Sequence, residues 1–228
     1  MSLQANLDAI RRQINTTCAA CGRDPQSVRL VAVSKLNPAA AVSAAAAAGQ
    51  RVFGENYVQE LLAKQEEVSA EVEWHFIGAL QSNKVKYLPG RVALIHSVDR
   101  LSLAREISRQ WGKAGLCADI LLEVHLGDEA SKAGADPAEL TELVRQVAPL
   151  PHLRIRGLMA LPPYCDDPEQ VRPYFRQLRQ LAEAIDALAV PGVSMAELSM
   201  GMSHDFTVAI EEGATLVRVG TAIFGART

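Results

Sequence analysis

The stretch Leu30-Val31-Ala32-Val33-Ser34-Lys35 is an apolar run that ends abruptly in a lysine. Valine and leucine without a long polar gap are typical of a strand buried on both faces. Alternate residues of a strand share a face, so we expect Val31, Val33 and Lys35 to point the same way. Such a lysine reaches water, pairs with an anion or loses its charge. A lysine whose charge is disfavoured attacks carbonyls more readily, whereas the simpler interpretation is a lysine that snorkels out to solvent.

Short apolar runs and helical patterns alternate along the rest of the chain. Strands are predicted at residues 30–35, 51–56, 74–78, 92–98, 117–126, 154–160, 197–200 and 215–219. Helices or helical turns are predicted at 37–49, 57–69, 83–88, from 99 onward, 137–148, 168–188 and 203–212, with a polar loop at 127–135. This alternation implies parallel strands with right-handed crossovers. Eight units in 228 residues favour an α/β fold in which one domain, 1–228, forms a closed (β/α)8 TIM barrel.

The two ends of the chain depart from the regular barrel pattern. Apolar residues at helical spacing predict an extra helix over residues 3–20, before the first strand. No helix is expected after the eighth strand. Because a barrel closes on itself, we expect the N-terminal helix to cover the sector that this missing helix leaves vacant.

The charge balance argues against a nucleic-acid partner. The net charge is -3, the pI is near 6.0, and no Lys/Arg block stands out. No apolar run is long enough to span a bilayer, which argues against a membrane partner. The start of the chain, MSLQANLDAIRRQ, lacks the basic and apolar segments of a secretory signal. We therefore expect a soluble cytoplasmic protein.

The Cys18-Ala-Ala-Cys21 segment has the spacing of a metal half-site or a redox pair. No second CxxC or HxxxH motif follows, so a closed zinc site would need scattered partners. Gly22 marks the end of a helix directly after the pair. The prediction is two buried or half-buried thiols, with neither a metal nor a structural disulfide.

Chemistry-bearing residues gather where the predicted strands end, and barrel sites form at these carboxyl ends. These ends carry Ser34-Lys35, Gly54-Glu55-Asn56, His75 with Gly78, His96-Ser97, Met159-Ala160, Ser199 to Ser203, and Arg218 to Thr221. Gly201 permits a close backbone approach, and Ser203 is predicted to cap a helix. The loops after strands seven and eight are the usual phosphate site of this barrel, although the serine could simply be a cap. Since strands one and eight are neighbours, a phosphorylated aldehyde such as pyridoxal 5'-phosphate would reach Lys35.

Six motifs in consistent order resemble one known family. They are VAVSK (31–35), FGENYVQE (53–60), WHFIGALQSNK (74–84), RGLMAL (156–161), LSMGMSHDF (198–206) and VRVGTAIFG (217–225). They look like the YggS/PROSC family of pyridoxal-phosphate homeostasis proteins, which is similar to the N-terminal barrel of alanine racemase. The resemblance runs from about residue 6 to Arg227. His204 stands where the family carries an acidic or other polar residue, one place past the serine, and is not expected to disturb phosphate binding.

The resemblance implies a role for each matching residue in holding pyridoxal 5'-phosphate. Lys35 would be the Schiff-base lysine, and Arg218 would lie near the pyridine nitrogen. The phosphate would be held by Ser203, Gly220 and Thr221, together with Ser199. Met159 would lie against the ring, and Asn56, His75 and Asn83 would lie around the pocket rim. The implied function is intracellular buffering or delivery of the cofactor, with apo-enzymes that require it as candidate recipients.

Arg218 bears on whether the chain is an enzyme. Arginine has no acceptor, so it cannot hold a proton on the ring nitrogen, and the ring is then a poorer electron sink. Alanine racemase uses such an arginine but needs a second base, a tyrosine from a C-terminal domain that this sequence is not expected to have. The tyrosines of this chain lie in no matching motif; they are Tyr57, Tyr87, Tyr164 and Tyr174.

Three hypotheses follow from these residues. The favoured one is a cofactor-holding protein with no committed reaction and no catalytic residue, acting as a monomer. The alternative is a low-activity pyridoxal-phosphate-dependent amino-acid racemase with Lys35 as its single base. A phosphosugar enzyme would need a paired acid and base, for which His75 and Glu55 are the candidates.

Overall fold

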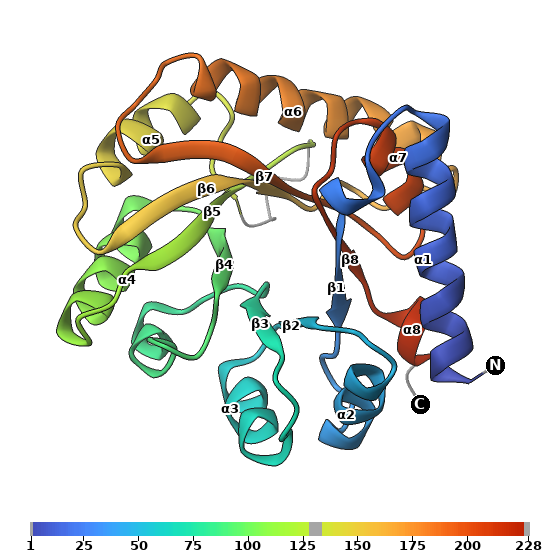
Figure 1. Ribbon diagram of the computed structural model, residues 1–228. Helices are drawn as coiled ribbons and strands as arrows, with labels where there is room; N and C mark the ends of the chain where they lie inside the picture. Colours follow the sequence, from blue (N-terminus) through green and yellow to red (C-terminus); the bar gives the residue numbers. More distant parts are fainter. Residues whose placement is uncertain (1, 128–133, 226–228) are drawn as a thin grey trace.

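Eight parallel strands close into a barrel in the order β1 to β8, with β1 paired to β8, in the part of the chain that the computed structural model describes, residues 2–127 and 134–225 (Figure 1). The strands are β1 (Arg29–Val33), β2 (Val52–Glu55), β3 (Glu73–Phe76), β4 (Leu94–Val98), β5 (Ala118–Val124), β6 (Leu153–Ala160), β7 (Val193–Met202) and β8 (Leu216–Val219). The α-helices are α1 (Leu3–Ala20), α2 (Ala39–Ala47), α3 (Val58–Glu67), α4 (Leu101–Lys113), α5 (Leu140–Val147), α6 (Arg172–Asp186), α7 (Phe206–Glu211) and α8 (Thr221–Phe224). The described residues also form short 3-10 helices, namely η1 (Pro25–Ser27), η2 (Ser82–Tyr87) and η3 (Pro168–Val171). The predicted (β/α)8 barrel is confirmed.

The N-terminal helix covers the sector beside the last strand, as expected. Figure 1 shows α1 standing next to α7 and α8. The Asn6 amide donates a hydrogen bond to the Ile223 carbonyl at 2.9 Å, which ties α1 to α8. The expectation that no helix follows the eighth strand was wrong, since α8 forms a single turn there. That turn is too short to cover the barrel, so α1 supplies the missing surface.

Side chains alternate between the inside of the barrel and the layer beneath the helices, because successive strand residues point to opposite faces. A small apolar cluster fills the interior, made of Val31, Leu94, Leu121, Met159 and Leu216. The outward-facing strand residues join the helices in a much larger core that includes Ala32, Phe53, Ile95 and Val217. The interior also holds polar side chains, among them His75, His96, Ser199 and Arg218, and these lead to the candidate site.

Two predicted strand boundaries need correction. β1 ends at Val33, so Lys35 lies in the turn after the strand and not on its face. β7 runs over ten residues, although residues 197–200 alone had been expected. The serine and glutamate residues of β7 interrupt its apolar pattern, so the sequence predicted only part of the strand.

Cys18 is buried in α1 and Cys21 is exposed, so the expectation of two buried or half-buried thiols holds for Cys18 alone. The predicted loop 127–135 lies mostly outside the described residues, which omit 128–133. No helix in the described ranges has the length and apolar character needed to cross a bilayer.

Candidate functional site

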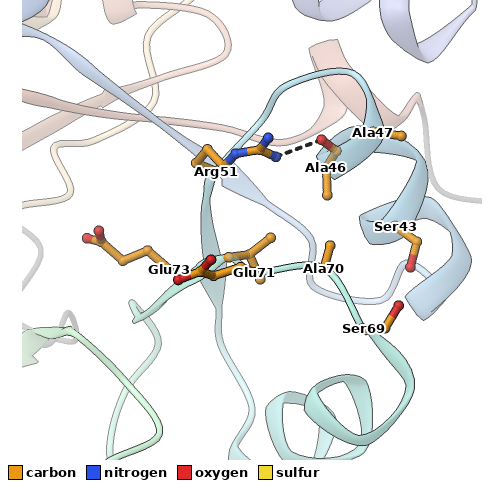
Figure 2. Close-up of a pocket in the computed structure, with 9 residues that line it drawn as sticks. Ser43, Ala46, Ala47, Arg51, Ser69, Ala70, Glu71 and Glu73 are labelled. Atoms are coloured by element: carbon orange, nitrogen blue, oxygen red, sulfur yellow. Dashed lines mark hydrogen bonds between the residues drawn. The ribbon is translucent and has the colours of Figure 1, made fainter.

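A surface depression of about 690 Å³ lies between α2 and the segment that leads into β3 (Figure 2). Its lining includes Arg51, which donates to the Ala46 carbonyl at 2.8 Å, and the carboxylates of Glu71 and Glu73. These residues lie where strands begin, at the opposite end from the predicted site. Two carboxylates disfavour a phosphorylated ligand, so the depression is not the candidate site.

Lys35 lies at the carboxyl end of the barrel, in the turn between β1 and α2, and it is half-buried. The next residue, Leu36, has a φ of 61°. A left-handed backbone is costly for a residue with a Cβ atom, so the surrounding structure must hold this turn in place.

Helix α3 holds the turn around Lys35 on both sides. The buried Lys64 ammonium donates to the Ser34 carbonyl and to Glu55 Oε1, each at 2.6 Å, and to Glu60 Oε1 at 2.7 Å. Glu60 Oε1 also accepts the Leu36 N–H at 2.5 Å. All three ammonium protons are used, and the peptide groups on either side of Lys35 are fixed to one helix. We call Glu55, Glu60 and Lys64 the α3 clamp.

The Glu55 carboxylate also joins the α3 clamp to the strand end. It accepts the Ser34 hydroxyl at 2.6 Å, and burial raises its pKa although the Lys64 hydrogen bond acts against this. Sequence reasoning missed the clamp, naming Glu55 only as a possible catalytic acid. The signal that could have found it was Lys64, which falls on the buried face of α3 with Leu61.

Two hydroxyl groups meet across the loops after β7 and β8. Ser203 Oγ accepts the Gly220 N–H at 3.3 Å and lies 3.3 Å from Thr221 Oγ1. The prediction that Ser203 caps the following helix was wrong, because α7 begins at Phe206. The serine hydroxyl is therefore directed to the neighbouring loop and not to α7.

Two glycines allow the strand ends to approach closely. Gly201 has a φ of 87°, and a Cβ atom there would come within 2.5 Å of the Ala209 Cβ. A Cβ on Gly220 would lie 3.2 Å from the Val33 carbonyl oxygen, so the end of β8 is packed against the end of β1. The hydroxyl pair is consequently placed beside the turn that carries Lys35.

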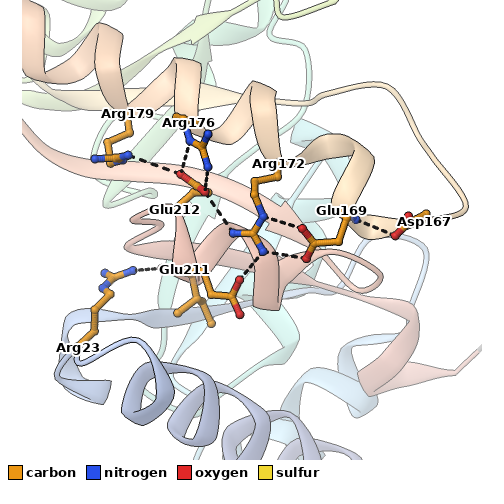
Figure 3. Close-up of polar contacts among 9 residues, drawn as sticks. Arg23, Asp167, Glu169, Arg172, Arg176, Arg179, Glu211 and Glu212 are labelled. Carbon is orange, nitrogen blue, oxygen red and sulfur yellow. Dashed lines mark hydrogen bonds and ion pairs between the residues drawn. The ribbon is translucent and has the colours of Figure 1, made fainter.

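An ion-pair cluster holds α7 against α6 (Figure 3). Glu212, at the end of α7, is almost fully buried and lies 3.1 Å from Arg172, 3.0 Å from Arg176 and 3.5 Å from Arg179. Arg23 donates to the Ile210 carbonyl at 2.5 Å and so joins the end of α1 to the same helix. The cluster fixes the helix that follows the Ser203 loop.

Arg218 brings a buried positive charge to the floor of the site. Its Nη1 donates to Ser199 Oγ and its Nη2 to the Ala160 carbonyl at 2.9 Å. Burial lowers the pKa of Arg218 to about 10, opposed by the charges of Glu123 and Asp205, so the guanidinium stays charged at neutral pH. Ser199, which was predicted to help hold the phosphate, is fully buried, and its hydroxyl contacts Arg218 and His96.

His75 is not on the rim of the pocket, which corrects its predicted place. It is fully buried in the barrel, with Nε2 2.6 Å from Glu73 Oε1 and Nδ1 2.9 Å from His96 Nε2. Alternate residues of a strand share a face, and His75 lies two residues beyond Glu73 on β3. Both side chains therefore point into the barrel. Sequence reasoning also placed His96 at a strand end without a role, although it touches both His75 and Ser199.

The remaining predicted site residues are Met159, Asn56 and Asn83. Met159 is fully buried in the interior apolar cluster, level with Glu123 on β5. Asn56 follows β2 and its Oδ1 is buried with no hydrogen-bond partner among the described residues. A Cβ on Gly78 would come within 2.3 Å of the Asn56 carbonyl oxygen, so the turns after β2 and β3 touch. Asn83 is exposed in η2, in the loop that follows β3.

Glu123 is a further buried acid that sequence reasoning passed over. It lies on β5, and burial, helped by the charge of Asp99, raises its pKa to about 7, while Arg218 acts in the opposite direction. The apolar residues on either side of it in the predicted strand concealed its inward-facing position.

The donors present fit a phosphorylated pyridine aldehyde. Ser203, Gly220 and Thr221 offer hydroxyl and amide groups of the kind that bind phosphate. The Arg218 guanidinium can donate to a ring nitrogen, and Lys35 supplies an amine. Asn56 Oδ1 is buried and has no hydrogen-bond partner within residues 2–127 and 134–225, so it can accept a ligand hydroxyl. The fold and this set of donors define a barrel of the alanine racemase N-terminal class, and the model of that domain matches residues 5–228.

Similarity to known proteins identifies the family within this class. The chain belongs to the family of pyridoxal phosphate homeostasis proteins: it is 46% identical over 228 residues to the Aquifex aeolicus member, covering 100% of this chain and 99% of that one. It is similar to PipY of Synechococcus elongatus solved with pyridoxal phosphate bound, at 40% identity and a TM-score of 0.87 over 98% of this chain and 100% of PipY. Alanine racemase of Clostridium difficile shares the fold, at 14% identity and a TM-score of 0.75 over 99% of this chain and 57% of the racemase.

Proposed function

We propose that this chain binds pyridoxal 5'-phosphate at the carboxyl end of its barrel and acts in the homeostasis of that cofactor. The observation that carries the proposal is the packing of Gly220 against Val33, which sets the Ser203–Thr221 hydroxyl pair beside the Lys35 turn. A cofactor with a phosphate at one end and an aldehyde at the other needs this pairing of groups. PipY, a relative at 40% identity, was solved with pyridoxal phosphate bound.

Each residue of the site has a defined part in this proposal. Lys35 would supply the amine that binds the aldehyde covalently, and Ser203, Gly220 and Thr221 would hold the phosphate. Arg218 would donate to the pyridine nitrogen, Met159 would lie against the ring, and Asn56 and Asn83 would lie toward the rim. When bound, the cofactor supplies an electrophilic carbon conjugated to an electron-withdrawing ring.

Holding the cofactor, and not turning over a substrate, is the function that the site supports best. Arg218 donates hydrogen bonds and accepts none, so it does not keep a proton on the ring nitrogen. The relatives are named for homeostasis and not for a reaction. The racemase alternative therefore has less support than the cofactor-holding function.

Delivery in the cytoplasm to apo-enzymes that require the cofactor, by a monomer of this chain, completes the proposal. Large apolar side chains are exposed on loops that follow β1, β2 and β6, namely Leu36, Tyr57 and Tyr164. A recipient enzyme would contact these loops, because the cofactor leaves through the same end of the barrel. Light scattering coupled to size-exclusion chromatography measures the oligomeric state.

The test separates holding from catalysis. Purified protein is reconstituted with pyridoxal phosphate, bound cofactor is measured by absorbance, and the product is incubated with L-alanine and other L-amino acids. We expect bound cofactor and no D-enantiomer by chiral chromatography beyond a Lys35→Ala control. Turnover well above that control would refute the holding function, and failure to bind the cofactor would refute the whole proposal.

A further inference from the structure

A continuous row of polar side chains crosses the inside of the barrel from Arg218 to Glu73. Arg218 Nη1 donates to Ser199 Oγ, which lies 2.8 Å from His96 Nδ1. His96 Nε2 lies 2.9 Å from His75 Nδ1, and His75 Nε2 lies 2.6 Å from Glu73 Oε1. Ser199, His96 and His75 are each 0% exposed, whereas the Glu73 side chain is 39% exposed where β3 begins. The row therefore links the floor of the site to solvent at the other end.

The two ends of the row fix the direction of every hydrogen bond in it. Arginine only donates, so Ser199 Oγ accepts from Arg218 and turns its own proton to His96 Nδ1. A neutral His96 then carries its proton on Nε2 and donates to His75 Nδ1. The proton of His75 is left on Nε2, where it meets Glu73. The His75 hydrogen bond holds the pKa of Glu73 below its ordinary value, so this carboxylate is an acceptor at neutral pH.

The opposite direction requires one more proton inside the barrel. His75 would have to be an imidazolium that donates from Nδ1, and His96 would then donate from Nδ1 to Ser199. Ser199 would lose the acceptor for its own proton, and a second cation would lie in the interior that already holds Arg218. Burial, more than any other cause, lowers the pKa of His96 well below its ordinary value, with the Arg218 and Arg29 charges acting in the same direction.

Other charged groups reach this interior from several strands. At the end where the strands begin, Arg29 of β1 lies 3.3 Å from Glu73 and 2.8 Å from Glu197 of β7. At the other end, Glu123 of β5 and Asp205 act on Arg218. The two carboxylates beside Arg29 have different second partners. Glu73 contacts His75 of the row, whereas Glu197 accepts a hydrogen bond from the Thr215 hydroxyl.

We propose that Ser199, His96, His75 and Glu73 are positioning residues for Arg218. Their hydrogen bonds all run in one direction and orient the guanidinium toward the cofactor ring. The orientation of the guanidinium therefore depends on whether residue 73, at the far end of the barrel, accepts or donates its hydrogen bond. The orientation toward the ring rests on the proposed function. The direction of the hydrogen bonds does not depend on the cofactor, so it can be measured in the cofactor-free protein.

Nuclear magnetic resonance of the cofactor-free protein labelled with ¹⁵N-histidine reads the direction. Correlations within each ring distinguish a protonated from an unprotonated nitrogen. We expect both His75 and His96 to carry a proton on Nε2 and none on Nδ1. Glu73→Gln, whose amide can donate as well as accept, should give a second set of signals for both rings. Glu197→Gln is the matched control, since it also removes a carboxylate beside Arg29, and should leave the signals unchanged.

Cofactor affinity tests the coupling to Arg218. We expect Glu73→Gln and Ser199→Ala each to raise the dissociation constant of pyridoxal phosphate by about threefold to tenfold, the value of one hydrogen bond, and Glu197→Gln to leave it unchanged. Because Ser199→Ala cuts the chain between Glu73 and Arg218, adding Glu73→Gln to it should cause no further loss.

Two results would overturn the inference: a proton on Nδ1 of either ring in the wild-type protein, or losses of affinity that multiply in the double variant. A wild-type protein that binds no pyridoxal phosphate would refute the proposed function instead. The ring signals of the cofactor-free protein would then decide the direction of the chain by themselves.

Discussion

The Lys64 ammonium lies 2.6 Å from the carbonyl oxygen of Ser34, the residue that precedes Lys35. A buried cation on α3 thus fixes the turn that presents the proposed Schiff-base lysine. Glu60 fixes the other side of the turn through the Leu36 N–H, where the backbone is left-handed. The position of Lys35 therefore depends on a neighbouring helix as much as on its own strand.

Removing the cation of the α3 clamp should destabilise the protein. Lys64→Met leaves the buried Glu55 carboxylate without its ion-pair partner, and we expect the free energy of unfolding to fall by about 3–5 kcal/mol. Chemical denaturation followed by circular dichroism measures it.

The double variant Lys64→Met/Glu55→Gln is the control for this loss. It removes both charges but keeps an acceptor for the Ser34 hydroxyl, so most of the lost stability should return. A single variant as stable as the wild type would show that the buried ion pair does not hold the turn.

Glu123 should make stability fall as pH rises. Its folded-state pKa is about 7 and its ordinary value is 4.5, so the folded chain keeps a proton that the unfolded chain has released between these values. Stability is therefore lost as pH increases from about 4.5 to 7. Glu123→Gln removes this penalty and should gain about 2–3 kcal/mol relative to wild type at pH 8 but little at pH 4. Thermal unfolding at both pH values measures the gain, and an equal effect at each pH would contradict it. Exposed Glu66→Gln is the control.

The Ser203–Thr221 hydroxyl pair should recognise the phosphate group. Ser203→Ala and Thr221→Val each remove one donor, and we expect about tenfold weaker binding of pyridoxal 5'-phosphate. Binding of pyridoxal, which lacks the phosphate, is the comparison and should be unchanged. Equal losses for the two ligands would place the phosphate elsewhere.

Glu212 should stabilise the protein at neutral pH and lose this effect in acid. Hydrogen bonds from Arg176 and Arg172 lower its pKa, so the contribution is present above the ordinary value of 4.5 and is lost as pH falls through the lowered value. Glu212→Gln should cost about 1–2 kcal/mol at pH 7 and less as the pH falls below about 4. Denaturation curves at several pH values measure this, and a loss independent of pH would rule out an ionic contribution.

The barrel and its site end could be predicted from the sequence because they depend on local patterns. Short apolar runs between helical segments gave the eight strands, and the adjacency of strands one and eight follows from closure. The prediction failed where an element carried polar residues, as in the long β7, or was a single turn, as in α8.

Side-chain partners inside the barrel could not be predicted in the same way. His75 and Ser199 lie near strand ends, so the sequence predicted His75 at the pocket rim and Ser199 at the phosphate. In the structure both side chains face the barrel interior and contact His96. Such contacts join residues 21 and 103 positions apart in the chain, and periodicity carries no information about them. Lys64 was hidden for a related reason, since a lysine on a helix is usually solvated.

The covalent bond to Lys35 is the central claim, and borohydride tests it most directly. Borohydride reduces a Schiff base to a stable secondary amine, so protein reconstituted with pyridoxal phosphate is reduced, digested and analysed by mass spectrometry. We predict one phosphopyridoxyl group, on the peptide that contains Lys35, and none there in Lys35→Ala. A label on another lysine, or no label on a protein that has bound the cofactor, would contradict the account.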